Sequence, residues 1–218
     1  MKILVADDDP IFQMLLTQML TKWGYDVLVA TDGNEAWKHI RSQAGPRLAI
    51  VDWVMPGLDG LELCRRVRVE RKNDYVYILL MTAKNKSSDL LTVMEAGADD
   101  YVTKPFDPEE LRLRIRAGCR VLESEERYRL IAQTASDGIV TADETGRIQF
   151  ANDAAAEIFG FLDSELLCRD FESLAPGYLD CFARSGGNAN SSEAPIELVG
   201  KHKTGREMPL EISLSECV

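Results

Sequence analysis

Short apolar runs alternate with amphipathic stretches along residues 1–120. The runs hold four to six residues and are largely apolar at consecutive positions: Ile3–Ala6, Tyr25–Ala30, Leu48–Val51, Val76–Met81 and Asp100–Thr103. Between them, apolar residues recur at helical spacing at about 11–22, 34–43, 60–70, 87–96 and 108–122. Strands that are apolar on both faces are typical of a parallel sheet covered by helices on both sides. The pattern therefore predicts an α/β, doubly wound domain with a five-stranded, mostly parallel sheet.

The helix that begins near residue 108 has no clear end. Asp107-Pro108 supplies an N-cap followed by a proline at the first helical position, as Asp9-Pro10 does earlier in the chain. From Pro108 to Ala132 there is no further proline, and the only glycine is Gly118. We therefore expect residues 108–132 to form the last helix of the first domain and also the linker that follows it.

The pattern changes in character after Ser136-Asp137-Gly138. Two pairs of short strands are predicted, separated by short helical pieces and a Gly/Asn/Ser loop at Ser185–Ser192. The predicted strands are Ile139–Ala142 with Arg147–Ala151, and Ile196–Lys201 with Glu207–Leu214. A strand pair followed by short helices and a second strand pair indicates an α+β domain with an antiparallel sheet. We assign this domain to residues 133–218.

Charge is distributed unevenly between the two halves. The net charge is −11, and residues 1–120 carry 18 acidic and 17 basic side chains, whereas residues 121–218 carry 18 acidic and only 8 basic ones. Contacts with nucleic-acid phosphates need clustered lysine and arginine. We therefore expect no direct nucleic-acid binding by the second half.

Composition also limits the cellular setting. The five cysteines are scattered, with no Cys-x-x-Cys pair, which argues against a disulfide framework or a zinc site. They are Cys64, Cys119, Cys168, Cys181 and Cys217. No apolar run approaches the roughly 20 residues of a membrane-spanning helix, and the first residues enter a strand directly. We expect a cytoplasmic protein with reduced thiols and no membrane contact.

Polar residues follow the predicted strands at the points where the strands end. Asp7-Asp8 follow the first strand and Asp52 follows the third, while Thr82 and Lys104 follow the fourth and fifth. In open parallel sheets, sites form outside the carboxyl ends of the strands. We therefore expect these five side chains to face one crevice.

Their chemistry suits phosphoryl transfer. Three carboxylates in one crevice repel one another unless a cation joins them, and a set of oxygen ligands without His or Cys favours Mg²⁺. A carboxylate such as Asp52 can act as a nucleophile and form an aspartyl phosphate. The metal and Lys104 would neutralise the developing charge, and the hydroxyl of Thr82 can donate to a phosphoryl oxygen.

With these residues in view, residues 1–120 resemble the receiver domain of two-component response regulators. The matching stretches are Asp7-Asp8, Asp52-Trp53-Val54-Met55-Pro56-Gly57-Leu58-Asp59-Gly60, Thr82-Ala83, Gly97-Ala98-Asp99-Asp100-Tyr101 and Lys104-Pro105-Phe106. The resemblance implies a flavodoxin-like fold in which Asp52 is the phosphoacceptor and the Lys104–Pro105 bond is cis. It implies Mg²⁺ held by Asp8, Asp52 and the carbonyl of Val54, with Asp7 assisting through water. Thr82 and Tyr101 would be the switch pair, and the phosphoryl donor would be a histidine kinase or a phosphotransfer protein. Asp99 and Asp100 are interpreted as helix-end and turn residues.

Residues 124–215 resemble a PAS sensor domain. The matching stretches are Ala135-Ser136-Asp137-Gly138-Ile139-Val140, Gly146-Arg147-Ile148-Gln149-Phe150-Ala151-Asn152, Ala154-Ala155-Ala156-Glu157-Ile158-Phe159-Gly160 and His202-Lys203-Thr204-Gly205-Arg206-Glu207-Met208-Pro209-Leu210-Glu211-Ile212-Ser213. A PAS sheet normally has five strands, and the pattern predicts four before Val218. We therefore expect the last strand to be missing, either because the sequence is part of a longer protein or because the domain is incomplete.

The PAS resemblance does not identify a ligand. Haem-binding relatives carry a histidine on the helix before the second strand pair, but here that helix, at about 177–185, holds Tyr178 and Cys181 instead. His202 lies at a strand end and is interpreted as an exposed polar residue. Cys168-Arg169 lacks the asparagine that precedes the reactive cysteine of flavin-binding relatives. We expect neither haem nor flavin, and an apolar pocket whose ligand is unknown.

The sequence thus predicts a signalling protein without output catalysis of its own. The effect of phosphorylation at Asp52 would be relayed along the helix at 108–132 to the PAS domain and to a further output domain. Alternatively, this sequence is the front part of a hybrid histidine kinase or of a cyclic-dinucleotide enzyme. An aspartyl-phosphate hydrolase would need a second aspartate where Val54 stands. A degenerate receiver acting only as an interaction module is opposed by the intact set of site residues.

A homodimer is expected through the helix at 108–132. Its predicted seam is Leu111, Ile115 and Leu122, with Gly118 between them. The alternative is that these residues only pack the helix onto its own sheet.

Overall fold

A computed structural model describes residues 1–42, 44–70, 75–83, 87–167, 169–184 and 195–215. The chain divides into two compact units, Met1–Arg127 and Tyr128–Val218. The predicted loop Ser185–Ser192 and two of the cysteines, Cys168 and Cys217, lie outside the described residues. Within those residues, no helix has the length and apolarity required to cross a membrane.

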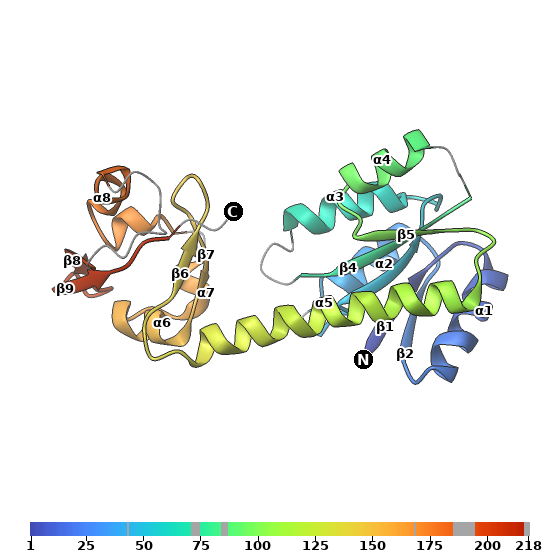
Figure 1. Cartoon of the computed structure of the whole chain (residues 1–218), viewed down its shortest axis with the longest axis horizontal. Helices are drawn as coiled ribbons and strands as arrows, with labels where there is room; N and C mark the ends of the chain where they lie inside the picture. Colours follow the sequence, from blue (N-terminus) through green and yellow to red (C-terminus); the bar gives the residue numbers. More distant parts are fainter. Residues whose placement is uncertain (43, 71–74, 84–86, 168, 185–194, 216–218) are drawn as a thin grey trace. The chain divides into compact units, whose positions relative to one another are not determined.

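The first unit is built on one parallel sheet of five strands (Figure 1). The strand order is β2-β1-β3-β4-β5, so the chain reverses its direction of winding between β1 and β3. The strands are β1 (Lys2–Ala6), β2 (Asp26–Ala30), β3 (Leu48–Asp52), β4 (Tyr77–Thr82) and β5 (Asp100–Thr103). The prediction of a doubly wound, flavodoxin-like sheet is confirmed.

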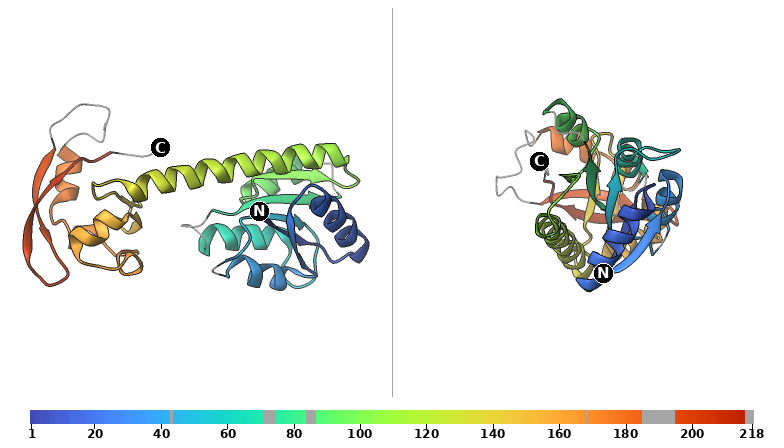
Figure 2. Two further views of the ribbon diagram at one scale, coloured as in Figure 1. Left: turned by 90° about the horizontal axis from the view of Figure 1, so that it is seen from below. Right: turned by 90° about the vertical axis from the view of Figure 1, so that its right-hand side faces the viewer.

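Five helices cover the two faces of this sheet, as Figure 2 shows from two directions. They are α1 (Pro10–Lys22), α2 (Gly33–Ile40), α3 (Gly60–Glu70), α4 (Ser87–Glu95) and α5 (Pro108–Thr134). One core joins the sheet to α1 and α5, and a second core joins its other face to α2, α3 and α4. The predicted caps are present, because the side chain of Asp9 accepts from Ile11 N and that of Asp107 accepts from Glu109 N.

Cys64 illustrates how dry the second of these cores is. Its side chain has no exposed surface, and burial raises the pKa of the thiol to about 12. The thiol is free and packs as a small apolar group, as expected from its sequence context.

The inner face of α5 corrects the predicted dimer seam. Leu111 and Ile115 are fully buried and Leu122 nearly so, all in the core between α5 and the sheet. A Cβ on Gly118 would lie 2.7 Å from the ring of Tyr77, so this glycine lets α5 approach its own sheet. The seam prediction is therefore wrong: these residues hold α5 to the sheet and are not available to a second helix.

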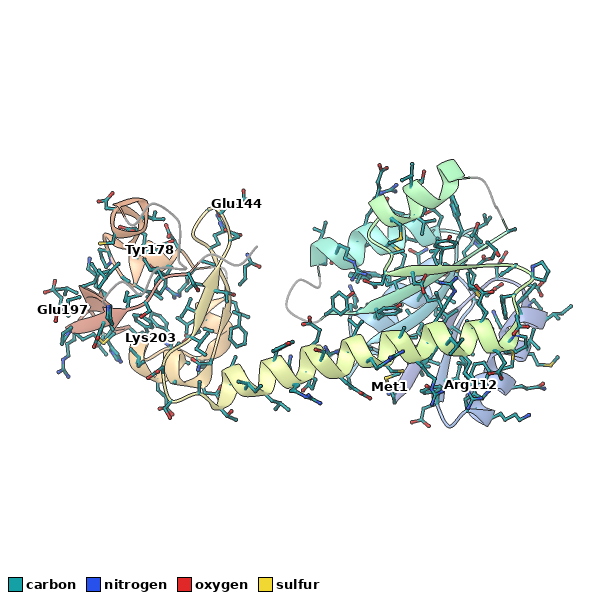
Figure 3. All side chains as sticks on the ribbon, in the orientation of Figure 1. Met1, Arg112, Glu144, Tyr178, Glu197 and Lys203 are labelled. Carbon is teal, nitrogen blue, oxygen red and sulfur yellow. The ribbon has the colours of Figure 1, made fainter. Side chains whose placement is uncertain are left out.

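The second unit contains two separate antiparallel hairpins with short helices between them. The strands are β6 (Val140–Ala142), β7 (Ile148–Ala151), β8 (Ile196–Lys201) and β9 (Glu207–Ile212), and β6 pairs with β7 as β8 does with β9. Figure 3 shows Glu144 at the tip of the first hairpin. The helices are α6 (Asp153–Phe159), α7 (Asp163–Leu166), a 3-10 turn at Phe171–Ser173 and α8 (Tyr178–Arg184). The predicted α+β class is confirmed.

A buried amide fastens the end of α5 to the second unit. Asn152 is fully buried, and its Nδ2 donates to the carbonyl oxygens of Ala132 and Asp137, each at 2.9 Å. Its Oδ1 accepts from Ile139 N and Ala155 N at 2.8 and 3.0 Å, and so also caps α6. With donors and acceptor both used, this one side chain holds the last turn of α5, the start of β6 and the start of α6 together.

Candidate functional site

The three aspartates predicted to share a crevice do meet at the carboxyl ends of β1 and β3. Asp7 and Asp8 follow β1, Asp52 ends β3, and one carboxylate oxygen of each lies within 4.8 Å of the others. Asp7 is fully buried, Asp52 is half-buried and Asp8 is exposed. The strand order places β1 beside β3, which is why residues 45 positions apart in the chain come together.

Lys104 supplies the positive charge at this site. Its Nζ lies 2.7 Å from Asp7 Oδ2 and 3.1 Å from Asp52 Oδ2, so it bridges the two less exposed carboxylates. The Lys104–Pro105 peptide bond is cis, as the receiver resemblance implied. The lysine side chain is itself 13% exposed, which strengthens its interaction with the carboxylates because little water screens it.

The charge balance of the crevice leaves Asp52 poorly stabilised as an anion. Burial raises the pKa of the Asp52 carboxyl above its ordinary value, and the negative charge of Asp7 adds to that increase. The hydrogen bond and the charge of Lys104 oppose it. In this cluster of three carboxylates, one lysine is therefore shared by Asp7 and Asp52, and the pKa of Asp52 stays raised.

A hard divalent cation fits this donor set. The converging ligands are carboxylate oxygens only, with neither imidazole nor thiolate among them, and Mg²⁺ prefers such ligands. A cation would also stabilise the ionised form of Asp52 against the burial and the charge of Asp7 that raise the pKa of its carboxyl. Val54, whose carbonyl was implied as a further ligand, lies two residues beyond Asp52 with an exposed side chain.

The two residues predicted as a switch pair lie on neighbouring strands. Thr82 ends β4 and is 1% exposed, and its carbonyl accepts from Lys104 N at 2.7 Å. Tyr101 is half-buried on β5, in register with Leu80. The guanidinium of Arg114 lies 5.6 Å from the ring centroid of Tyr101. The structure therefore puts Thr82 at the carboxyl end of β4, opposite Thr103, and Tyr101 two residues before Thr103 on the neighbouring strand.

The loop after Asp52 is held close to the sheet by a glycine. Gly60 N donates to Trp53 O at 2.8 Å, and a Cβ on Gly60 would lie 2.4 Å from the carbonyl oxygen of Asp52. Gly57, in the same loop, has a φ of 75°, which favours glycine. Gly60 thus lets the start of α3 approach the backbone at Asp52, and Gly57 allows the turn before it, a role that their presence in the matched motif did not specify.

Sequence reasoning missed one residue at the site, Phe12. Lys104 Nζ lies 4.2 Å from the centroid of its ring, a cation–π distance, and the ring of Phe106 is 6.4 Å away. Phe12 is on the first turn of α1, half-buried. Its helical spacing gave no sign of this contact, because an aromatic residue at such a position is also typical of a core.

A second charged cluster lies at the opposite end of the sheet, near the start of β4. Asp99 Oδ2 accepts from Arg68 Nη2 and from Ile78 N, both at 2.6 Å, and its Oδ1 accepts from the hydroxyl of Tyr75. The description of Asp99 as a helix-end residue was incomplete. It joins α3, β4 and the segment before β5.

The core of the second unit is aromatic. The rings of Phe159 and Phe171 are 6.2 Å apart and those of Phe171 and Tyr178 are 4.9 Å apart, both in edge-to-face arrangements. Figure 3 labels Tyr178, whose hydroxyl has its pKa raised by burial and by the charge of Asp170. His202, interpreted as exposed, is half-buried: a Cβ on Gly160 would lie 2.0 Å from its Nε2.

Comparison with known families finds matches in two parts of the chain. Residues 3–116 match the response regulator receiver domain, and residues 126–190 match a PAS domain. The first match covers more than half of the 218 residues.

Two curated relatives are regulators. The chain is 35% identical over 173 residues to the alkaline phosphatase synthesis transcriptional regulatory protein PhoP of Bacillus subtilis, covering 79% of this chain and 70% of PhoP. It is 42% identical over 124 residues to the DNA-binding response regulator MtrA of Mycolicibacterium smegmatis, covering 57% of this chain and 53% of MtrA. The chain thus spans about half the length of MtrA.

Two solved structures resemble the first unit. A putative response regulator from Chloroflexus aurantiacus is 38% identical, with a TM-score of 0.50, and the match covers 54% of this chain and 95% of that one. A probable two-component system response regulator/GGDEF domain protein is 29% identical, with a TM-score of 0.53, and the match covers 56% of this chain and 50% of that one.

Proposed function

Since the chain belongs to the response regulator receiver family and carries a PAS domain after the receiver, we propose that it is a phosphoacceptor of a two-component system. Asp52 accepts a phosphoryl group in a reaction that needs Mg²⁺. The change at Asp52 passes through α5 to the PAS domain, and the protein acts as a homodimer. The receiver is formed by residues 1–120 and the PAS domain by residues 133–218. The helix at 108–132 belongs to the receiver and also links it to the PAS domain.

The chemistry at Asp52 follows from the charges around it. A carboxylate oxygen of Asp52 forms a bond to phosphorus while the bond from phosphorus to a nitrogen of the donor histidine breaks, and that imidazole leaves with the electron pair and takes up a proton. Lys104, already 3.1 Å from Asp52, neutralises charge on the transferred group. The residues that would hold Mg²⁺ are Asp8, Asp52 and the carbonyl of Val54, with Asp7 assisting through water, and the ion would supply further neutralisation of charge. The hydroxyl of Thr82 donates a hydrogen bond to the phosphoryl group on Asp52. Tyr101 responds to the formation of that hydrogen bond.

One observation carries this proposal: oxygens of three carboxylates lie within 4.8 Å of one another, and Lys104 forms ion pairs with two of them. A purely structural cluster would be neutralised by the protein's own donors, whereas this one has a clear excess of negative charge. The excess fits a site that works with a divalent cation and an incoming phosphoryl group.

The test is phosphorylation by a small-molecule donor such as acetyl phosphate, followed by intact mass. The wild type with Mg²⁺ should gain one phosphoryl group, and Asp52→Asn should gain none. Asp9→Asn is a matched control, because it removes one charge of the same acidic run but keeps a side-chain oxygen for the N-cap of α1. Persistent labelling of Asp52→Asn would show that another residue is the acceptor.

The exposed side of α1 supports a protein donor. Ile11, Met14 and Leu15 are 69%, 59% and 42% exposed, next to the crevice that α1 follows in the chain. We propose that a histidine kinase or phosphotransfer protein docks here. Met14→Glu should slow transfer from a phosphorylated kinase and leave loading by acetyl phosphate unchanged; equal rates from the kinase would rule out this surface.

The output differs from that of the DNA-binding relatives. Residues 121–218 carry 18 acidic and 8 basic side chains, which disfavours contact with DNA phosphates. We propose that the PAS domain responds to phosphorylation and binds neither haem nor flavin, since α8 lacks a histidine. An absorption spectrum with a Soret or flavin band would contradict this. A GGDEF-type output, as one structural relative's name indicates, is the second candidate for the whole protein.

A further inference from the structure

Phe12 lies against Lys104 at the crevice and is not part of the surrounding cores. The centroid of its ring is 4.2 Å from Lys104 Nζ, and the side chain is half-buried. Among the residues that the structure describes, Phe12 belongs to neither of the two cores that join the sheet to its helices. Core packing, which is the usual role of an aromatic residue on a helix, therefore does not account for its place.

The first turn of α1 fixes the position of the ring. Asp9 caps the helix by accepting from Ile11 N at 2.8 Å, and Gln13 N donates to Asp9 O at 3.0 Å. The side chain of Gln13 also donates from Nε2 to Asp7 O at 2.5 Å. Since Phe12 lies between Ile11 and Gln13, both of its neighbours in the chain are tied to the segment that carries the aspartates.

Phe106 links the ring of Phe12 to the body of the receiver. The two ring centroids lie 6.4 Å apart, and the ring planes are tilted by 52°. Phe106 is half-buried and packs against the core between the sheet, α1 and α5. Aromatic pairs at such distances are favourable beyond the area that they bury. The ring of Phe12 is therefore held by its own helical turn and by a neighbour that is anchored on the core.

Lys104 needs such a contact because its other partners change during the reaction. Its ammonium group has three donors on a flexible stem, and Nζ lies 2.7 Å from Asp7 Oδ2 and 3.1 Å from Asp52 Oδ2. Asp52 is the proposed acceptor, and both carboxylates belong to the cluster that could hold a cation. The ring is neutral and takes part in neither event, so its contact with the ammonium group persists while the carboxylate contacts are exchanged.

We propose that Phe12 is a positioning residue for Lys104: the face of its ring holds the ammonium group between Asp7 and Asp52 and so increases the rate of phosphoryl transfer. The inference rests on the proposed function of Asp52 as phosphoacceptor. Positioning contributes because a charged group that is displaced by about 1 Å loses much of its effect on a reacting centre. A cation–π contact at a partly exposed site accounts for a change of about three- to ten-fold in rate.

The experiment measures initial rates of loading of the full chain by acetyl phosphate with Mg²⁺, followed by intact mass. Phe12→Leu should slow loading by about five-fold, because it removes the ring but keeps an apolar side chain. Phe12→Tyr retains an aromatic face and should stay within about two-fold of the wild type. Circular dichroism confirms that each variant is folded.

Phe161→Leu is the matched control for the loss of a ring. The centroid of the Phe161 ring lies 4.4 Å from the guanidinium of Arg169 and 5.4 Å from Lys203 Nζ, so this ring also has cationic neighbours. It belongs to the second unit of the chain. Its replacement should therefore leave the loading rate unchanged.

A second set of rates separates positioning from a general effect on the fold. In a Lys104→Met background, Phe12→Leu should cause no further slowing, since the ring then has no ammonium group to hold. Phenylalanine analogues with one, two and three fluorine atoms at position 12 weaken the negative face of the ring and nearly keep its size. Loading should fall stepwise along this series when Lys104 is present and stay level with Lys104→Met.

The contact itself is measured without a phosphoryl donor. In the NMR spectrum, the ring current of Phe12 should shift the ε-methylene protons of Lys104 upfield, and Phe12→Leu should abolish that shift. An unshifted lysine resonance in the wild type, equal slowing by Phe12→Leu with and without Lys104, or rates that ignore Phe12→Leu or the fluorine series would overturn the inference. A wild type that accepts no phosphoryl group would instead contradict the phosphoacceptor proposal, and the lysine resonance would still decide whether the ring holds the ammonium group.

Discussion

The two charged clusters at opposite ends of the receiver sheet look alike in composition but differ in balance. Each contains buried carboxylate and a basic side chain. At the start of β4, Asp99 is matched by Arg68, by the hydroxyl of Tyr75 and by Ile78 N, so both of its oxygens accept from the protein. At the other end, Asp7, Asp8 and Asp52 lie together, and Lys104 forms ion pairs with Asp7 and Asp52.

The difference separates a structural group from a reactive one. Arg68 also donates to the carbonyls of Gly97 and Val76, so the Asp99 cluster is closed by its own hydrogen bonds. The crevice has more negative charge than its lysine neutralises, and this leaves it suited to a cation and a phosphoryl group. Burial of charge alone would not have told the two apart.

The largest expected effect is on stability at the closed cluster. Asp99→Ala leaves Arg68 without its carboxylate, and because the pair is only partly exposed we expect a loss of about 2–3 kcal/mol in the free energy of unfolding. Urea denaturation measures it. Glu62→Ala, which breaks an exposed pair with Arg65, is the control and should cost about 0–1 kcal/mol.

The same variant also tests the comparison itself. Folded Asp99→Ala should still accept a phosphoryl group on Asp52, since Asp99 lies at the other end of the sheet. If the folded variant were inactive, the division into a structural and a reactive cluster would be wrong.

The next effect is on metal binding in the crevice. Asp8→Asn removes a proposed Mg²⁺ ligand, so the Mg²⁺ concentration for half-maximal loading by acetyl phosphate should rise by about ten-fold or more. Titration of the loading rate with Mg²⁺ measures this. Asp9→Asn should leave the Mg²⁺ requirement unaltered; a shift as large as that of Asp8→Asn would mean that general charge, not ligation, sets it.

The sequence predicted the fold and the convergence of Asp7, Asp52 and Lys104 for a physical reason. Continuous apolar runs reveal strands that are buried on both faces, and polar residues directly after those runs must lie at one edge of a parallel sheet. The positions of Asp7, Asp52 and Lys104 along the chain were therefore enough to predict that the three side chains face one crevice. The strand order places β1 beside β3, and the side chain of Lys104, which follows β5, reaches both Asp7 and Asp52.

What the sequence left open depends on contacts between distant segments. Leu111 and Leu122 have the spacing of either a seam or a core face, and only their packing on the sheet decides between them. Phe12 and Asp99 act through partners far along the chain, which periodicity does not identify. In the PAS domain, the role of Asn152 in holding the end of α5 likewise appears only when the carbonyls of Ala132 and Asp137 are seen to converge on it.

The smallest expected effect is a gain in stability from neutralising Asp52 without metal. The raised pKa of Asp52 means that the protonated carboxyl stabilises the fold below its ordinary pKa, and that this contribution is lost as pH rises through the raised value. Asp52→Asn keeps an uncharged side chain at every pH. In EDTA at neutral pH, the variant should therefore unfold at a higher urea concentration than the wild type. The gain should be smaller than the loss caused by Asp99→Ala, and it should shrink as the pH is lowered. Saturating Mg²⁺ should reverse the order, because the wild type then gains a bound cation that Asp52→Asn binds more weakly. Equal stability of the two proteins in EDTA at neutral pH would show that Lys104 already compensates for the carboxylates, and the crevice would then resemble the closed cluster at Asp99.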